Sequence, residues 1–466
     1  MKVKIKNLGA VHEADIELRP LTVFVGANNT GKTWAAYALS AVLGQYGWDK
    51  YTSAYVADKV SDQYLPIEKA IEQLLEEGNA NIDLVQFFDE YGSDYINNVA
   101  LLAPRWMREF MGTQQASFED LRLDVELQDT RSYMLSGIRA SSSEGKLSVS
   151  KEGKALLNAI KEPGESTLHF YTTESGVPEK FPRRVIKSFV AARVFMVIHR
   201  ALYPDVYFFP AERAAITSFI RSVKVEPEIG HDDLPKKEPG GVPLAHPIGN
   251  LVTLTRDVYP YCSYAARLEE AKKYDGVRDI LELAELPQKA ILRGTLDLSK
   301  SEPELPGELL FELSGDSEVT LDMPVVSSMV KGLSSLVLYL RYIAKPRDLL
   351  VIDEPEMNLH PEAQVQLAEF LAMLVNAGLN VLVTTHSPYI VDHLVNLMKA
   401  ATREDQESIK DKFYLGRTDA FISRDNVSVY LFEDNTAKNI LDDEGFIDWD
   451  TFSRVSEQIS HLYFEI

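Results

Sequence analysis

The chain has a single cysteine, Cys262, among its 466 residues. An intrachain disulfide is therefore excluded, and the low cysteine content is typical of the reducing cytoplasm, where we expect the protein to reside. Runs of roughly 18 or more apolar residues are also missing, so no membrane-spanning helix is expected. The N-terminal segment 1–6 alternates charged and apolar residues, which predicts a strand and differs from the continuous apolar stretch of a secretory signal.

Positive charge is scarce as well. The chain has 48 Lys and Arg residues against 70 Asp and Glu residues, a net charge of −22. Such a surface is not suited to coating nucleic acid without sequence preference, although a local basic groove would still allow nucleic-acid binding. The segment most suited to a groove carries Lys180, Arg183, Arg184, Lys187, Arg193 and Arg200. The same residues could instead form the solvated face of a helix, which is the interpretation we favour.

One octapeptide near the N-terminus follows the pattern G-x-x-x-x-G-K-[ST] of phosphate-binding loops. It consists of Gly26, Ala27, Asn28, Asn29, Thr30, Gly31, Lys32 and Thr33. An apolar run at 21–25 predicts a strand before it, and apolar residues at helical spacing predict a helix at 34–43. In this context the backbone N–H groups and the helix N-terminus would bind the phosphates of ATP. Lys32 would reach the β- and γ-phosphates, and Thr33 would ligate Mg²⁺. The alternative is a chance glycine turn.

A second acidic motif would complete such a site. The apolar run 349–352 predicts a core strand, and Asp353 follows at its carboxyl end, where open α/β sheets bind ligands. Asp353 would hold Mg²⁺, and the next residue, Glu354, would polarise the attacking water. The alternative is that the two acids cap the following helix.

A third polar residue follows another buried strand. His386 lies 33 residues beyond Asp353, after the apolar run 381–383. We predict that His386 contacts the γ-phosphate and the catalytic water, and so senses whether ATP is intact. The alternative is a structural histidine.

The length predicts about two or three structural units. Periodicity predicts strands at 2–7 and 14–18, helices over 45–112, strands over 117–172, a helix at 182–203, a strand at 206–209, helices over 251–285 and short strands over 291–322. The segment 225–250 contains five prolines and the pair Gly240-Gly241, which predicts a flexible loop. Within it, His231, Asp232 and Asp233 are interpreted as loop charges rather than metal ligands.

The segment 353–364, Asp-Glu-Pro-Glu-Met-Asn-Leu-His-Pro-Glu-Ala-Gln, resembles the D-E-P-E-x-x-L-H-P-x-x-Q motif of ABC-class ATPases that lack membrane domains. These include the RecF/SMC-like group, the overcoming-lysogenisation-defect (OLD) ATPases and related AAA-family ATPases of bacterial anti-phage defence. Residues 384–388 resemble their switch segment, and residues 5–18 resemble their opening hairpin. Residues 209–213 resemble the point at which these proteins return to the ATPase core after a long insertion. In that segment Arg213 could reach the nucleotide or the insertion, or pair with a carboxylate.

The resemblance implies an α/β fold: an ABC-type P-loop NTPase head with an antiparallel β-subdomain and a mainly helical insertion. The expected head comprises residues 1–44, 205–224 and 286–466. Residues 45–204 would form the inserted helical and β region, and residues 225–285 a flexible loop with a helical segment.

The resemblance also implies that the chain binds and hydrolyses ATP and assembles as a homodimer or higher homo-oligomer, with ATP sandwiched between two heads. Signature serines of one head would then contact the γ-phosphate held by the other, and the matching residues are Ser327 and Ser328. Met329 stands where the family usually has glycine, a departure that could mean altered or slow hydrolysis. The alternative is an ordinary serine N-cap. No glutamine matches the family's Q-loop.

A nuclease of its own is not expected in this chain. Glu433 and the acids of 448–450 are too close in sequence for the Toprim arrangement of many OLD-type proteins, and we interpret them as loop charges. The resemblance therefore implies a separate effector, a nuclease or toxin, that the ATPase regulates in antiviral defence. The alternative is a DNA-repair or chromosome-maintenance ATPase that clamps DNA. A transporter subunit fits the motifs less well.

Overall fold

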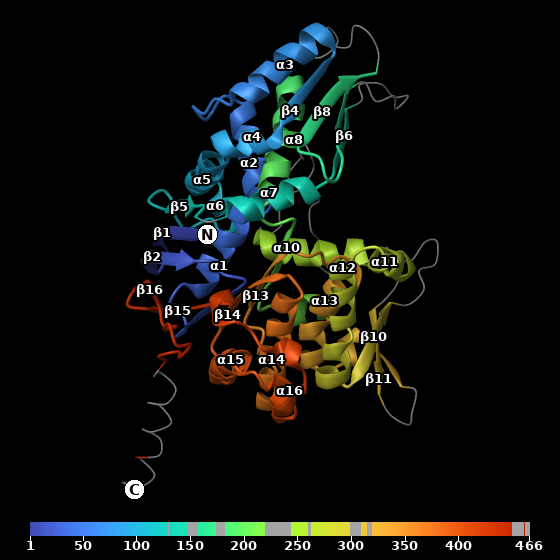
Figure 1. The fold of residues 1–466 in the computed structure, drawn as a ribbon. Coiled ribbons are helices and arrows are strands. Elements are labelled where there is room, and N and C mark those ends of the chain that lie inside the picture. The colour runs from blue at the N-terminus through green and yellow to red at the C-terminus, as the bar shows by residue number, and fades with distance from the viewer. Residues whose placement is uncertain are drawn as a thin grey trace. The chain divides into compact units, whose positions relative to one another are not determined.

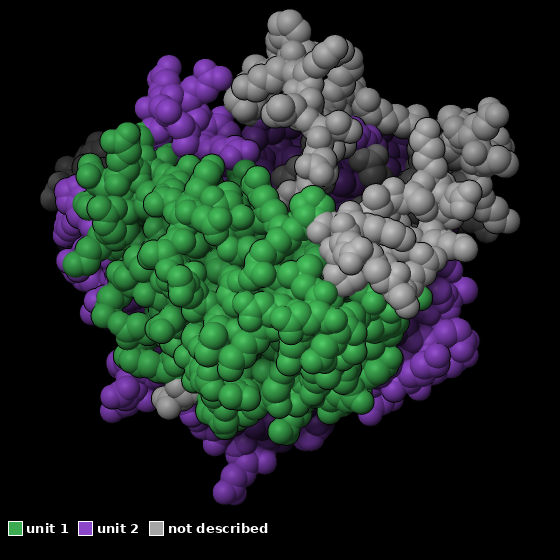
Figure 2. Space-filling model, turned by 90° about the horizontal axis from the view of Figure 1, so that it is seen from above, with its two compact units in different colours: residues 1–8, 38–107, 117–206 green, residues 9–37, 108–116, 207–466 purple. Residues whose placement is uncertain are grey.

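The computed structural model describes residues 1–128, 130–147, 157–173, 182–219, 244–259, 262–298, 309–314, 319–449 and 461. The chain forms two compact units (Figure 2). Unit 1 consists of residues 1–8, 38–107 and 117–206, and unit 2 consists of residues 9–37, 108–116 and 207–466. The domain bounds predicted from the sequence stay a prediction. Most of the loop predicted at 225–250, with His231, Asp232 and Asp233, lies outside the described residues.

Unit 2 is built on a mostly parallel sheet (Figure 1). Its strands, in spatial order, are β2 (Val11–Glu17), β16 (Thr436–Asn439), β15 (Val427–Glu433), β3 (Leu21–Gly26), β14 (Asn380–Thr385), β13 (Leu349–Asp353) and β9 (Val206–Phe209). Every residue of β3 and of β13 is buried, as expected for parallel strands that are covered on both faces. β14 pairs in parallel with both β3 and β13, so the carboxyl ends of these three strands meet at one edge.

Helices and a small antiparallel sheet complete unit 2. The helices are α9 (Arg213–Phe219), α10 (His246–Thr253), α11 (Tyr264–Ala271), α12 (Asp275–Leu283), α13 (Ser328–Tyr342), α14 (Pro361–Asn376), α15 (Pro388–Ala401) and α16 (Gln406–Ile409). Helices α13 and α14 are mostly buried because their apolar residues reach nearly all round the helix. The small sheet consists of β10 (Gly294–Leu298), β11 (Leu309–Leu313) and β12 (Thr320–Asp322). This agrees with the strands predicted over 291–322.

Unit 1 contains two antiparallel strand groups. In one, β1 (Lys2–Leu8) pairs with β5 (Arg122–Glu126). The other has the order β4 (Asn79–Asp83), β8 (Thr167–Thr172), β7 (Leu157–Lys161) and β6 (Ser143–Leu147). The longer helices are α2 (Gln45–Val56), α3 (Leu65–Glu77), α5 (Ser93–Leu101), α7 (Arg131–Ala140) and α8 (Arg183–Arg200).

Buried aromatic side chains fill the core of unit 1. The rings of Tyr95, from α5, and Phe195, from α8, are stacked with 4.7 Å between their centroids. Tyr51 from α2 meets both rings edge-on, and its hydroxyl is 2.6 Å from that of Tyr64. Aromatic pairs of this kind add to the burial of area and fix the relative positions of the helices.

Two segments of unit 1 differ from their predictions. Helices were predicted over 45–112, but residues 79–83 form strand β4, which pairs with β8. Strands were predicted throughout 117–172, but residues 131–140 form helix α7. Its buried residues Met134, Gly137 and Ile138 are three and four positions apart, so they share one face of the helix. The alternating pattern on either side of this segment concealed the helical spacing. The strands β5, β6, β7 and β8 do lie within the predicted range.

Within the basic segment 180–200, the residues of α8 form a helix, which is the interpretation favoured from the sequence. Lys187 Nζ lies 2.7 Å from Asp58 Oδ1, and Arg183 Nη2 lies 3.4 Å from Glu68 Oε2. Arg200 Nη2 lies 2.9 Å from Asp205 Oδ2. These ion pairs neutralise positive charge that a nucleic-acid-binding groove would require. Lys180 lies outside the described residues.

Acid is expected to destabilise unit 1 through His199 of α8, which is almost fully buried. Burial lowers the pKa of His199 from its ordinary value of 6.5 to about 4. As the pH falls through this window, the unfolded chain binds a proton that the folded chain excludes. The stabilisation is fully present above pH 6.5, and roughly 3 kcal/mol of the free energy of unfolding is lost by pH 4.

Urea unfolding of the whole chain at several pH values in this window measures the loss. The variant His199→Gln should lack this part of the pH dependence, because glutamine does not titrate. His169→Gln, at a partly exposed histidine of the same unit, is the matched control and should keep it. An unchanged pH dependence in His199→Gln would contradict the assignment.

Candidate nucleotide-binding site

The predicted phosphate-binding loop joins β3 to α1 (Lys32–Leu43), and its glycines are required by the backbone. Gly26 and Gly31 have φ angles of +138° and +98°. A Cβ atom on Gly26 would lie 2.4 Å from Phe432 O, and one on Gly31 would lie 2.6 Å from Val11 Cγ2. Any other residue would therefore strain the backbone and clash with a neighbour. Between them, Ala27, Asn28 and Asn29 are exposed at the tip of the loop.

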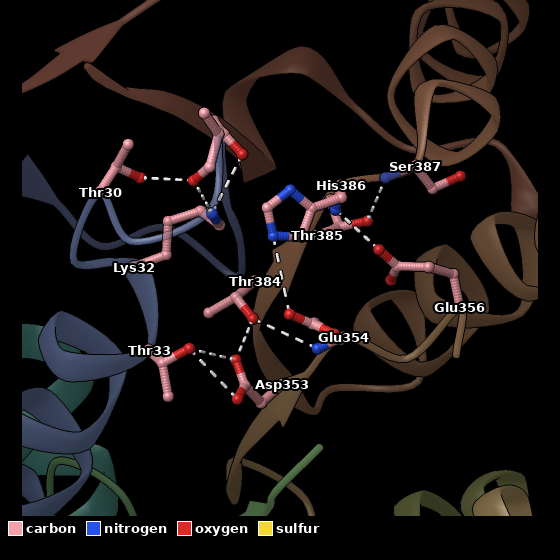
Figure 3. Close-up of polar contacts among 12 residues, drawn as sticks. Thr30, Lys32, Thr33, Asp353, Glu354, Glu356, Thr384, Thr385, His386 and Ser387 are labelled. Carbon is pink, nitrogen blue, oxygen red and sulfur yellow. Dashed lines mark hydrogen bonds and ion pairs between the residues drawn. The ribbon is translucent and has the colours of Figure 1, made fainter. Parts of the chain in front are cut away.

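The loop folds around its own lysine (Figure 3). The Lys32 ammonium donates to Gly26 O at 3.0 Å and to Ala27 O at 2.8 Å. Thr30 Oγ1 donates to Ala27 O at 2.9 Å. Burial lowers the pKa of Lys32, while the acids Glu354, Asp353 and Glu356 raise it. The ammonium thus lies at the centre of the loop, where a bound phosphate could replace the carbonyls as its partner.

Thr33 and Asp353 meet at the adjoining strand end. Thr33 Oγ1 donates to Asp353 Oδ1 at 3.0 Å and is 3.3 Å from Oδ2. Thr384 Oγ1, from β14, donates to the same Oδ1 atom. Burial raises the pKa of Asp353, and these two hydroxyl donors lower it. Residues separated by 320 positions are brought together here because β3 and β13 both pair with β14.

Glu354 has an unusual backbone conformation. Its φ angle is +47°, in the left-handed region that a residue with a Cβ avoids, and it precedes Pro355, which restricts it further. Its N–H group donates to Thr384 O at 3.0 Å. Its Oε1 atom lies 3.6 Å from His386 Nε2 (Figure 3). Strain of this kind is found at functional sites, where surrounding contacts maintain it.

His386 and its neighbours are fixed by buried polar contacts. The N–H group of His386 donates to Glu356 Oε1 at 2.7 Å, while Glu356 Oε2 is buried without a hydrogen bond. Burial and the ammonium of Lys32 lower the pKa of His386, whereas Glu354 raises it. The next residue, Ser387, caps α15 by accepting from Ile390 N at 3.2 Å, and its hydroxyl donates to Gln364 at 2.6 Å. Sequence reasoning gave no role to Glu356, whose only signal was its place in the motif.

Arg213 does not pair with a carboxylate, which is one of the roles considered from the sequence. Its side chain is 3% exposed, and it donates to main-chain carbonyls rather than to a carboxylate. Its Nε atom donates to Gly332 O at 3.0 Å, and its Nη2 atom donates to Glu354 O at 2.8 Å. Its Nη1 atom donates to two carbonyls, Pro210 O at 3.1 Å and Asp353 O at 2.7 Å. A residue pattern cannot reveal carbonyl partners, because every residue has a carbonyl.

Ser327 and Ser328 lie at the start of α13. Ser327 is the N-cap, and its hydroxyl accepts from Val330 N at 3.3 Å. Both serines are exposed, and Met329 is half-buried. The hydrogen bonds described for the loop do not include either serine. Ser327 is thus an N-cap within its own chain, and a contact of either serine with a nucleotide held by another copy stays a prediction.

The residues at this edge suit a magnesium nucleotide. Backbone N–H groups at the N-terminus of α1, with Lys32 beside them, match the charge of a polyphosphate. A threonine hydroxyl and a carboxylate are the hard oxygen donors that Mg²⁺ prefers. Among the described residues there is no group of three or more His, Cys, Asp or Glu side chains that could hold a metal ion. Glu433 pairs with Lys438 at 3.3 Å, and Asp450 lies outside the described residues.

Two family models match the chain. Residues 1–167 match the AAA ATPase domain, and residues 205–392 match an AAA domain described for candidate AbiEii toxins of type IV toxin–antitoxin systems. Together the two matches assign the chain to the AAA ATPases. The predicted α/β fold class of this ATPase is confirmed by the mostly parallel sheet of unit 2 and its helices.

Solved structures similar to this ATPase include heads of SMC proteins. One is an SMC head bound to the C-winged helix domain of ScpA, with 13% identity, 94% of this chain and 96% of that chain covered, and a TM-score of 0.35. Another, from Pyrococcus furiosus, is an SMC head with an extended coiled coil bound to the C-terminal domain of ScpA; it has 12% identity, 98% of each chain covered and a TM-score of 0.36. The SMC head from Thermotoga maritima has 10% identity, 94% and 97% coverage and a TM-score of 0.28.

No curated protein matches this ATPase. In the part of the chain that the structure describes, none of the helices combines the length and apolar character needed to cross a bilayer.

Proposed function

We propose that this ATPase binds ATP with Mg²⁺ and hydrolyses it to ADP and phosphate. The observation that supports this most strongly is the meeting of Thr33, Asp353 and Glu354 at one sheet edge, beside the lysine of the loop. Thr33 and Asp353 would hold the Mg²⁺ ion, which would offset negative charge on the phosphates. The family models support nucleotide binding but leave hydrolysis as a proposal.

The roles of the side chains follow from their positions. Lys32 would exchange its two carbonyl contacts for phosphate oxygens and stabilise the charge of the transition state. Glu354 would accept a hydrogen bond from the attacking water and orient it towards the γ-phosphate. His386, 3.6 Å from Glu354, would report whether the γ-phosphate is present through the segment that follows it.

We further propose that ATP drives the assembly of two or more copies, with Ser327 or Ser328 of one copy completing the site of another. Both serines are exposed at the helix start, as such a contact requires. The assembled ATPase would regulate a separate effector, a nuclease or toxin, in bacterial antiviral defence. The match to an AAA domain of candidate AbiEii toxins supports this setting.

ATP is expected to convert the purified chain from the 52.4 kDa monomer to a dimer or larger assembly. Mass photometry or light scattering with Mg-ATP, and with Mg-ADP as the control, measures this change. Purification of the ATPase with its native partner then identifies the effector. A mass that is the same with ATP and ADP would contradict the assembly. Binding to duplex DNA that ATP strengthens and salt weakens would instead favour a DNA-clamping ATPase.

A further inference from the structure

Three segments of unit 2 converge on Arg213. The segment that precedes α9 supplies Pro210 O, the carboxyl end of β13 supplies the carbonyls of Asp353 and Glu354, and α13 supplies Gly332 O. Four hydrogen bonds from one buried guanidinium give this junction a defined geometry, since the planar donor group accepts little rearrangement. The start of α13, with its N-cap Ser327 and its first residue Ser328, is thereby linked to Glu354, the residue predicted to orient water.

The contact with Glu354 bears on its strained backbone. The left-handed conformation of Glu354 is held from both sides, since its N–H group donates to Thr384 O and its carbonyl accepts from Arg213. A shift of α13 that moved Gly332 would pull on the same guanidinium that holds this carbonyl. The direction of the Glu354 side chain therefore depends on the position of α13.

A second residue of α9 reinforces the link. Thr217 Oγ1 donates to Arg213 O at 2.9 Å and lies 3.3 Å from Lys331 O, one residue before Gly332. Thr217 is buried, so these contacts are shielded from water. Its neighbour Ser218 donates to Ala214 O, inside α9, and thus provides a matched control.

We propose that Arg213 is a positioning residue that couples α13 to Glu354. Docking of Ser327 on a nucleotide held by a second copy would fix α13, and Arg213 would transmit this to the carbonyl of Glu354. Water would then be oriented for hydrolysis only when the partner copy is in place. This inference rests on the proposed composite site.

The test measures ATP affinity and kcat separately, because a merely structural residue would affect both. Arg213→Lys keeps the charge but cannot reach all four carbonyls, so kcat should fall about tenfold or more while the Kd for a fluorescent ATP analogue changes less than about twofold. Thr217→Val should lower kcat by about threefold, and Ser218→Ala should leave it unchanged. Thr217→Val also tests the link if Arg213→Lys does not fold.

A double-mutant cycle tests the coupling itself. Ser327→Gly removes the hydroxyl while keeping an acceptable N-cap. In the wild-type chain this substitution should lower kcat about tenfold. In the Arg213→Lys background it should lower kcat less than about twofold. In the Thr217→Val background the loss of kcat should also be smaller than in the wild-type chain. Additive losses, an unchanged kcat in Arg213→Lys, or equal losses of affinity and kcat would each overturn the proposal. If the wild-type chain itself does not turn over ATP, the proposed function fails first, and this inference fails with it.

Discussion

Replacing Lys32 by alanine is expected to abolish ATP binding and turnover. The ammonium lies inside the loop where the phosphates would bind, 3.0 Å and 2.8 Å from the carbonyls of Gly26 and Ala27. Loss of one charged donor of this kind lowers turnover by roughly 100- to 1000-fold, and affinity falls with it because the phosphates are charged before the reaction starts. Isothermal titration with ATP and a phosphate-release assay measure the two quantities.

The matched control is Lys410→Ala, which removes a partly exposed lysine of the same unit that pairs with Glu407. This variant should bind and hydrolyse ATP as the wild type does. Circular dichroism checks that Lys32→Ala keeps the fold. A folded Lys32→Ala protein with normal affinity and turnover would show that the nucleotide binds elsewhere.

Replacing Glu354 by glutamine is expected to leave ATP binding intact and to lower turnover by roughly 100- to 10,000-fold, the range for loss of a group that assists proton transfer. Glutamine has nearly the same shape and tolerates the left-handed conformation no worse than glutamate does. ATP would then persist in the site, so the ATP-bound assembly should accumulate. Single-turnover hydrolysis and mass photometry after mixing with ATP measure both effects.

Glu362→Gln is the control for this substitution, since Glu362 is an exposed acid in the first turn of α14. It should show normal turnover and a short-lived assembly. Normal steady-state turnover in Glu354→Gln would exclude Glu354 as the residue that orients water. Glu356, whose pKa is raised by burial, would be the next residue to test.

The strands that form the sheet edge were predictable because each is a continuous apolar run followed directly by the polar residues of the site. Continuous apolar runs identify β3, β13 and β14, and parallel strands place their following residues at a common edge. The sequence therefore indicated that Thr33, Asp353 and His386 would be neighbours. Their roles in binding and hydrolysis stay predictions that the variants above test.

The remaining features depend on long-range contacts that a single sequence does not encode visibly. Arg213 acts through carbonyl partners that lie up to 141 positions away and that any residue could supply. The positive φ of Glu354 arises from its two flanking hydrogen bonds rather than from its residue type. Helix α7 was missed because a short amphipathic helix lies between stretches of alternating residues.

The pairing of β3 has a consequence for how the chain folds during synthesis. Leu21 of β3 faces Val427 of β15, 406 positions later in the chain, and β14 on its other side is nearly as distant. At about 5–20 residues per second, the ribosome needs roughly 20 to 80 seconds to make that interval. Until β14 is made, which takes most of this time, both edges of an apolar strand are unpaired, and this favours aggregation. We therefore expect chaperones to bind the nascent chain before the loop acquires its shape, and a product terminated before β14 and β15 should lack that shape.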